Sequence, residues 1–119
     1  MRILVVDDSV TMRKIISKSL KTEGYPDVIE ASDGADAMSK MSGVDLVLLD
    51  WNMPVMDGMS FVKEARQSPV FGSVPIIMVT TEGAQKEVLQ ALKEGVNDYV
   101  VKPFKTDTLI QKIESVING

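Results

Sequence analysis

The sequence predicts an α/β fold, a doubly wound parallel sheet with helices on both faces. Strand and helix patterns alternate along all 119 residues and make five β-α units. The first, third and fourth predicted strands are continuously apolar, as strands buried on both faces of a parallel sheet require. Because crossovers between parallel strands are right-handed, their helices wind over both faces of the sheet. We expect one domain spanning residues 1–119.

The first two units are predicted as follows. Residues 2–6 form a strand, and 10–23 form a helix that is closed by Gly24. One face of that helix carries the apolar side chains Met12, Ile15, Ile16 and Leu20. A short strand over 28–31 leads to a helix opened by Ser32-Asp33-Gly34. Its apolar residues are Ala35, Ala37, Met38 and Met41.

The next two units contain the longest apolar strands. Residues 45–49 form the third strand, and the loop after it ends at Asp57-Gly58, which is typical of a turn and a helix start. The following helix carries Phe61, Val62 and Ala65. Strand 75–79 then precedes a helix over 84–94 that ends at Gly95.

The last unit consists of strand 98–101 and a helix that we expect Thr106 to cap. That helix carries Leu109, Ile110, Ile113, Val116 and Ile117. The chain stops at Gly119 without a linker, which favours a stand-alone protein over a domain cut from a longer one.

Composition and charge exclude several classes of function. The chain is 45% hydrophobic and 25% charged, as in ordinary globular proteins, and its net charge of −4 argues against nucleic-acid binding. A secretory signal and a membrane-spanning apolar stretch are both missing, so we expect a cytoplasmic protein without membrane contact. Cysteine and histidine are absent, which excludes the usual zinc sites and Ser-His or Cys-His nucleophiles. Any metal would be a hard cation held by oxygen, which favours magnesium or manganese.

Ligands of such sheets bind beyond the carboxyl ends of the strands. Asp7, Asp8, Asp50, Thr80 and Lys102 all fall at or just past those ends. Two carboxylates about 4 Å apart repel by roughly 4 kcal/mol at an effective dielectric near 20, so three require a cation or a shifted pKa. A divalent ion and Lys102 together would neutralise the three acids.

Other interpretations of these residues remain open. An Asp after a strand commonly caps a helix or starts a turn, but only one member of the adjacent pair Asp7-Asp8 can be a cap. Thr80 is also an ordinary strand or cap residue, although its hydroxyl could donate to an anion bound at Asp50. Tyr99 could be only a half-buried aromatic residue. The peptide bond between Lys102 and Pro103 is a candidate for the cis form.

The full set of residues resembles the receiver domains of response regulators. It consists of Asp7-Asp8, Asp50, Thr80 and Lys102-Pro103-Phe104, in that order on five β-α units, and covers essentially the whole chain. Further runs are similar to the chemotaxis members of the family: Val10-Thr11-Met12-Arg13, Asp50-Trp51-Asn52-Met53-Pro54, Met56-Asp57-Gly58, Met78-Val79-Thr80 and Tyr99-Val100-Val101. The resemblance implies a flavodoxin-like sheet of order 2-1-3-4-5 with five helices.

The resemblance also implies a chemical role for each residue of the cluster. Asp50 would accept a phosphoryl group from a histidine kinase, while Lys102 and the Thr80 hydroxyl would hold the phosphoryl oxygens. Mg²⁺, for which Mn²⁺ can substitute, would bind the Asp8 and Asp50 carboxylates and the Asn52 backbone carbonyl. Asp7 would act on the metal mainly through water.

Two further pairs of residues have roles in the family. Thr80 and Tyr99 would form the switch, in which Thr80 moves to the phosphoryl group and Tyr99 rotates into the vacated space. Asn52 and Glu82 would tune hydrolysis of the acyl phosphate. Thr81 departs from the family, whose members usually carry a small residue there, and its bulk would narrow access to Asp50.

The implied function is that of a monomeric chemotaxis response regulator, not an enzyme, which catalyses only its own phosphotransfer and dephosphorylation. Its partners would be a chemotaxis-type histidine kinase, the flagellar motor switch protein and a phosphatase. A phosphate sink, a phosphorelay receiver and a receiver cut from a longer regulator are the nearest alternatives.

Other classes fit less well. Phosphatases that use an aspartyl phosphate carry a second Asp where this chain has Asn52. A flavin binder needs a Ser/Thr/Gly-rich loop where Asp7-Asp8-Ser9 would repel phosphate, and a P-loop nucleotidase needs G-x-x-x-x-G-K.

Overall fold

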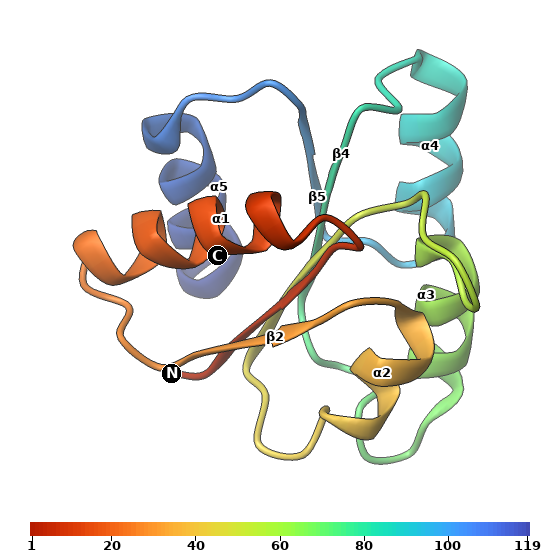
Figure 1. The fold of residues 1–119 in the computed structure, drawn as a ribbon. Helices are drawn as coiled ribbons and strands as arrows, with labels where there is room; N and C mark the ends of the chain where they lie inside the picture. The colour runs from red at the N-terminus through yellow and green to blue at the C-terminus, as the bar shows by residue number, and fades with distance from the viewer.

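A five-stranded parallel sheet forms the centre of the computed structural model, which describes residues 1–119 (Figure 1). The strands are β1 (Ile3–Val6), β2 (Val28–Ala31), β3 (Leu46–Leu49), β4 (Ile76–Thr80) and β5 (Asp98–Val101). Their order in the sheet is β2-β1-β3-β4-β5. This confirms the predicted fold class and the strand order that the family resemblance implied.

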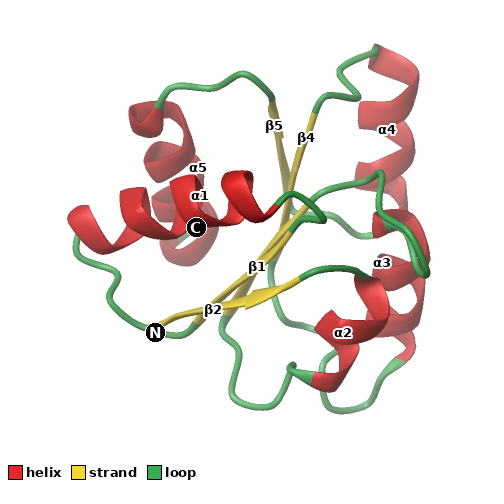
Figure 2. Ribbon diagram, viewed as in Figure 1, coloured by secondary structure: helices red, strands yellow, loops and turns green.

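Helices cover both faces of the sheet (Figure 2). They are α1 (Val10–Thr22), α2 (Gly34–Ser39), α3 (Gly58–Gln67), α4 (Gln85–Glu94) and α5 (Thr106–Asn118). Helices α1 and α5 lie on one face, while α2, α3 and α4 lie on the other. No helix is both long enough and apolar enough to cross a lipid bilayer.

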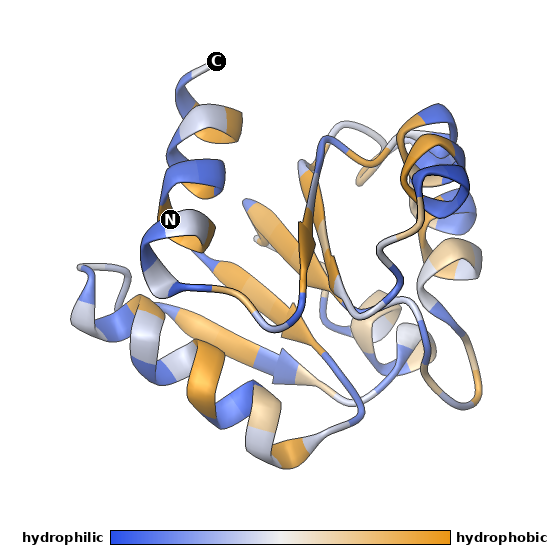
Figure 3. Cartoon of the chain, turned by 90° about the horizontal axis from the view of Figure 1, so that it is seen from above, coloured by the Kyte–Doolittle hydropathy of each residue, from blue (hydrophilic) through white to orange (hydrophobic).

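Alternate residues of the central strands belong to two separate cores. Leu4 and Val6 of β1 pack with α2 and α3, whereas Ile3 and Val5 pack with α1 and α5. Every residue of β1, β3 and β4 is buried, as the apolar runs predicted. Figure 3 shows these strands as the most hydrophobic part of the molecule, between helices with mixed surfaces.

Side chains cap three of the helices at their starts. Ser9 accepts from the Met12 N–H at α1, Asp33 from the Asp36 N–H at α2, and Asp57 from the Ser60 N–H at α3. Asp57-Gly58 is therefore helix-start chemistry, as predicted.

The two glycines predicted at helix ends have positive φ. Gly24 follows α1 with φ 97°, and Gly95 closes α4 with φ 111°. Both positions favour glycine because a side chain is strained in this backbone region.

Three local predictions are wrong. Helix α2 ends at Ser39, so Met41 lies beyond the helix, although its side chain is buried. Ile15 is 51% exposed and does not share the buried face of α1. That face is formed by residues four apart, such as Ile16 and Leu20, and Ile15 lies to one side of it. Thr106 does not cap α5, since it is already the first helical residue and Lys105 is in the cap position without a side-chain hydrogen bond.

Candidate functional site

The three predicted acids meet at the carboxyl edge of the sheet. Asp7 follows β1 and Asp50 follows β3, and the two strands are paired with Val6 opposite Leu49. The Asp50 N–H donates to the Val6 carbonyl at 2.9 Å, which fixes the two strand ends side by side. Carboxylate oxygens of Asp7, Asp8 and Asp50 lie within 4.8 Å of one another. The structure therefore confirms that the acids form one cluster.

The three acids differ in burial and in partners. Asp7 and Asp50 are only 2% and 8% exposed, whereas Asp8 is open to solvent. The Asp7 carboxylate accepts from the Lys102 ammonium at 2.6 Å through one oxygen and from the Ser9 N–H at 2.9 Å through the other. Both Asp7 oxygens are thus engaged by the protein, which leaves Asp8 and Asp50 as the more available ligands.

Lys102 enters the cluster from the end of β5, as predicted. Its Nζ lies 2.6 Å from Asp7 Oδ2 and 3.5 Å from Asp50 Oδ2, so it pairs more closely with Asp7. The Lys102–Pro103 peptide bond is cis. One ammonium group cannot balance three carboxylates, and the site retains a net negative charge.

The carboxyl of Asp50 is the acid whose pKa is raised. Burial is the main cause, and the nearby Asp7 charge adds to it. The Thr80 hydroxyl, the Lys102 ammonium and the Trp51 N–H oppose the rise in pKa, the last by donating to Asp50 Oδ1 at 2.7 Å. An additional cation would therefore favour the ionised form of Asp50, which is the form that can act as a nucleophile.

The start of α3 packs directly against the backbone of Asp50. The Gly58 N–H donates to the Trp51 carbonyl at 2.7 Å. A Cβ at Gly58 would overlap the Asp50 carbonyl oxygen and lie 2.8 Å from Trp51 Cα. Only glycine permits this approach, so the residue at the helix start also sets the position of Asp50.

Thr80 and Tyr99 lie on the neighbouring strands β4 and β5. Thr80 is fully buried, and its Oγ1 accepts from the Glu82 N–H at 3.4 Å. Tyr99 is 8% exposed, and its hydroxyl donates to the Glu82 carbonyl. Burial, followed by the charges of Glu82, Glu87 and Asp50, raises the pKa of Tyr99 to about 12. Both candidate switch residues therefore hold the backbone of Glu82.

Asn52 and Glu82 form a bridge between the loops that follow β3 and β4. The Asn52 amide donates to Glu82 Oε1 at 2.6 Å. Thr81, where the sequence departs from the family, has an exposed side chain. The structure thus brings together the pair that sequence reasoning placed two residues beyond Asp50 and Thr80.

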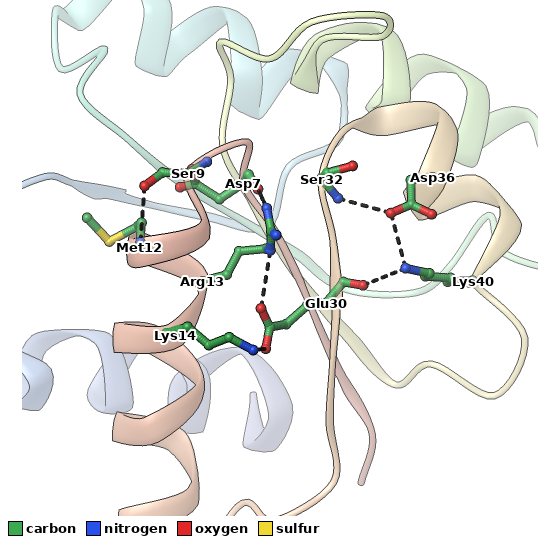
Figure 4. A network of polar contacts seen from close by, with 9 residues as sticks. All are labelled: Asp7, Ser9, Met12, Arg13, Lys14, Glu30, Ser32, Asp36 and Lys40. Atoms are coloured by element: carbon green, nitrogen blue, oxygen red, sulfur yellow. Dashed lines mark hydrogen bonds and ion pairs between the residues drawn. The ribbon is translucent and has the colours of Figure 1, made fainter.

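Arg13 is a residue of the site to which sequence reasoning gave no role. Its guanidinium donates to the Asp7 carbonyl at 2.6 Å and pairs with Glu30 at 3.2 Å, as Figure 4 shows. It therefore ties α1 and β2 to the backbone of the acid cluster. The available signal was a charged residue, Glu30, within the short strand after the helix that carries Arg13.

Comparison with known proteins identifies the family. Residues 3–114 match the response regulator receiver domain. The chain therefore belongs to the response-regulator receiver family, whose members bind Mg²⁺ through acidic residues.

Relatives and solved structures agree with this assignment. The chain is 48% identical to the chemotaxis protein CheY1 of Helicobacter pylori, over 98% of this chain and 97% of that protein. It is also 48% identical to a chemotaxis protein CheY homolog of Campylobacter jejuni, over 98% of this chain and 92% of that protein. The structure of chemotaxis protein CheY4 of Vibrio cholerae superposes with a TM-score of 0.89, at 36% identity and 97% coverage of each chain.

Proposed function

We propose that this protein is a single-domain chemotaxis response regulator, which accepts a phosphoryl group on Asp50 and signals to the flagellar motor switch. The observation that carries the proposal is the placement of Asp50. It is buried next to the carboxylates of Asp7 and Asp8, and Lys102 and Thr80 also lie beside it. The names of the two relatives at 48% identity support the chemotaxis role.

The donor set fits a hard divalent cation. All candidate ligands are oxygens, namely the carboxylates of Asp8 and Asp50, the backbone carbonyl of Asn52, and Asp7 through water. The indirect role of Asp7 agrees with its two hydrogen bonds inside the protein. When bound there, Mg²⁺ or Mn²⁺ supplies positive charge that lets an anionic carboxylate approach an anionic phosphorus.

Phosphotransfer needs alignment and charge neutralisation from the chain. An Asp50 carboxylate oxygen attacks the phosphorus of a phosphohistidine, so that an O–P bond forms as the N–P bond breaks. Lys102 and the Thr80 hydroxyl hold the phosphoryl oxygens as this occurs. The chain contains no histidine, and the donor therefore belongs to another molecule, a chemotaxis-type histidine kinase.

Removal of the phosphoryl group is governed by the pair Asn52 and Glu82. Their hydrogen bond links the loop that follows β3 to the loop that follows β4, and the pair tunes how readily water reaches the acyl phosphate. In this respect the protein catalyses only its own phosphorylation and dephosphorylation, and a separate phosphatase is a further partner.

The signal passes from Thr80 to Tyr99 through Glu82. When the Thr80 hydroxyl turns to the phosphoryl group, it gives up the hydrogen bond from the Glu82 N–H. Tyr99, whose hydroxyl donates to the carbonyl of the same residue, then rotates inward as that loop rearranges. The surface of α4, β5 and α5 changes as a result, and the monomeric protein docks the motor switch there in the cytoplasm.

The decisive experiment titrates a peptide of the flagellar motor switch against the protein with Mg²⁺ and beryllofluoride, which mimics the phosphoryl group. We expect tight binding with beryllofluoride and weak binding without it. The Asp50→Asn protein is the matched control and should bind weakly in both conditions. Modification of Asp50 with unchanged peptide affinity would instead favour the phosphate-sink or phosphorelay alternatives.

A further inference from the structure

A basic pocket lies between α1 and β2. Its volume is about 430 Å³, and no hydrophobic residue lines it. The lining residues are Lys14, Ser17, Lys18, Lys21, Thr22 and Glu30. The three lysines recur at intervals of four and three residues, which places them on one side of α1. Cations are thus concentrated at this point of a chain whose net charge is −4.

A buried hydroxyl of this pocket has no partner. Ser17 is 5% exposed, and its Oγ makes no hydrogen bond in the structure. A serine inside a helix commonly donates to the carbonyl four residues earlier, but this one does not. An unpaired buried hydroxyl is costly. Neighbouring atoms cover the Ser17 Oγ, so a ligand oxygen supplies the missing partner once the flexible lysine side chains around it move aside.

The single acid of the pocket is already neutralised. Glu30 accepts from Arg13 at 3.2 Å through one oxygen and from Lys14 at 3.3 Å through the other (Figure 4). Lys18 and Lys21 take part in none of the ion pairs of the protein. Two lysines that form no ion pair therefore remain among the residues that line the pocket with Ser17.

We propose that this pocket binds an oxyanion of the phosphate class, as inorganic phosphate or as the phosphomonoester group of a small metabolite. Lys18 and Lys21 pair with its charge, and the Ser17 hydroxyl donates to one of its oxygens. A long polyanion fits less well, because the pocket is small and the chain as a whole carries a net charge of −4. None of these residues belongs to the acid cluster, so the proposal is independent of the proposed function.

The test is an NMR titration of the full-length ¹⁵N-labelled protein with inorganic phosphate, at constant ionic strength and without divalent cations. We expect saturable shifts of the amides of Ser17, Lys18 and Lys21. Methyl phosphate is titrated in parallel. Equal affinity for both would identify a phosphomonoester as the ligand, and weaker binding of methyl phosphate would identify free phosphate.

Two variants separate this pocket from general charge effects. The Lys18→Gln/Lys21→Gln protein should bind phosphate at least about fivefold more weakly, since each lost ion pair is worth up to about 1 kcal/mol. The Lys63→Gln/Lys86→Gln protein, with the same net charge and substitutions at exposed positions, should bind as the unmodified chain does.

Ser17→Ala adds a second readout, because it removes an unpaired hydroxyl. It should weaken phosphate binding while leaving the free energy of unfolding unchanged or higher. Shifts that fail to saturate, equal affinities of the two lysine double variants, or binding of a poly-glutamate peptide in place of phosphate would overturn the proposal. The Asp50→Asn protein should bind phosphate normally, which separates this result from any failure of the signalling role.

Discussion

Asp50 carries a charge that the folded protein balances only in part. The residue is 8% exposed, and Lys102 lies closer to Asp7 than to Asp50. We expect Asp50→Asn to raise the free energy of unfolding without metal by on the order of 1 kcal/mol, a usual size for one residue. Urea denaturation at neutral pH measures this, with Asp107→Asn on exposed α5 surface as the control.

The pH dependence of that gain has a definite sign. In the folded protein, the pKa of Asp50 is raised above the ordinary value of 3.8. Between these two pKa values the folded state therefore keeps a proton on Asp50 that the unfolded state loses. Stability due to this group is present below 3.8 and is lost as the pH rises through the folded pKa. The advantage of Asp50→Asn should therefore vanish in acid. A gain that persists at low pH would show that ionisation of Asp50 is not its cause.

Tyr99 provides the corresponding prediction in alkali. Its pKa is raised from 10.0 to about 12, mainly by burial, so the folded state keeps a proton that the unfolded state loses. Stability from this group is complete below pH 10 and is lost as the pH rises through 12. Tyr99→Phe should cost about 1 kcal/mol at neutral pH, through the hydrogen bond to the Glu82 carbonyl.

The same variant should escape that alkaline loss of stability. When the pH titration is followed by phenolate absorbance, the component near pH 12 should be missing from Tyr99→Phe. An unchanged titration curve would contradict the assignment, and Tyr25→Phe serves as the matched control because Tyr25 is the only other tyrosine.

Val55 is the residue of the loop after β3 whose backbone favours glycine. Its φ is 66°, and the Met56 N–H donates to the Pro54 carbonyl at 2.7 Å across it, which makes a strained three-residue turn. The side chain is 86% exposed and gives little in return. Val55→Gly should raise the free energy of unfolding by about 0.5–1 kcal/mol and thereby raise the thermal midpoint. Val70→Gly, with 75% exposure and no positive φ, should lower it.

At the scale of elements, Arg66 fastens the end of α3 to the loops around it. Its guanidinium donates to the carbonyls of Gly95, Gly72 and Val74, and to the Asn97 side chain. No carboxylate balances it, and burial lowers its pKa. It therefore joins α3 to the turn before β4 and to the turn after α4 without forming an ion pair.

Arg66→Lys should destabilise the protein by about 2 kcal/mol, because an ammonium group cannot reach several carbonyls in a fork and leaves some unsatisfied. Chemical denaturation measures the change in the free energy of unfolding. Arg2→Lys is the control, since the Arg2 side chain lies 3.3 Å from Asp27 on the surface and is 43% exposed. Equal small losses in both variants would show that the Arg66 hydrogen bonds contribute little.

Arg66 also shows which elements the sequence could predict. The buried strands were predictable because an apolar run such as Leu46–Leu49 has no other stable place, and Asp50 follows directly from its end. The hydrogen bonds of Arg66 were not predictable, since an arginine on an amphipathic helix has the pattern of a surface charge. Its acceptors are carbonyls up to 29 residues away, which no local pattern indicates.

The same limit applies within the candidate site. Asp7, Asp8, Asp50, Thr80 and Lys102 were predictable because each lies at a strand end, and parallel strand ends meet at one edge. The Thr106 cap was predicted wrongly, because residue type alone does not fix which residue begins the helix. The roles of individual residues stay predictions that the experiments above address.

For the whole molecule, we expect the acid cluster to couple metal binding to global stability. Three carboxylates within 4.8 Å repel one another in the folded state and separate on unfolding. A cation that binds only the folded protein stabilises it, by about 1.4 kcal/mol at ten times its dissociation constant. For a domain of this size, this raises the thermal midpoint by about 6 °C.

Asp8 is the residue at which this coupling can be broken most cleanly. It is exposed and, unlike Asp7 and Asp50, is not contacted by Lys102, so Asp8→Asn removes a proposed metal ligand without disturbing a buried ion pair. We expect Mg²⁺ to raise the thermal midpoint of the unmodified protein and of Glu64→Gln, a control at an exposed position of α3. It should leave Asp8→Asn unchanged at matched ionic strength. A full Mg²⁺ effect in Asp8→Asn would place the cation elsewhere, and the assignment of Asp8 as a ligand would then be wrong.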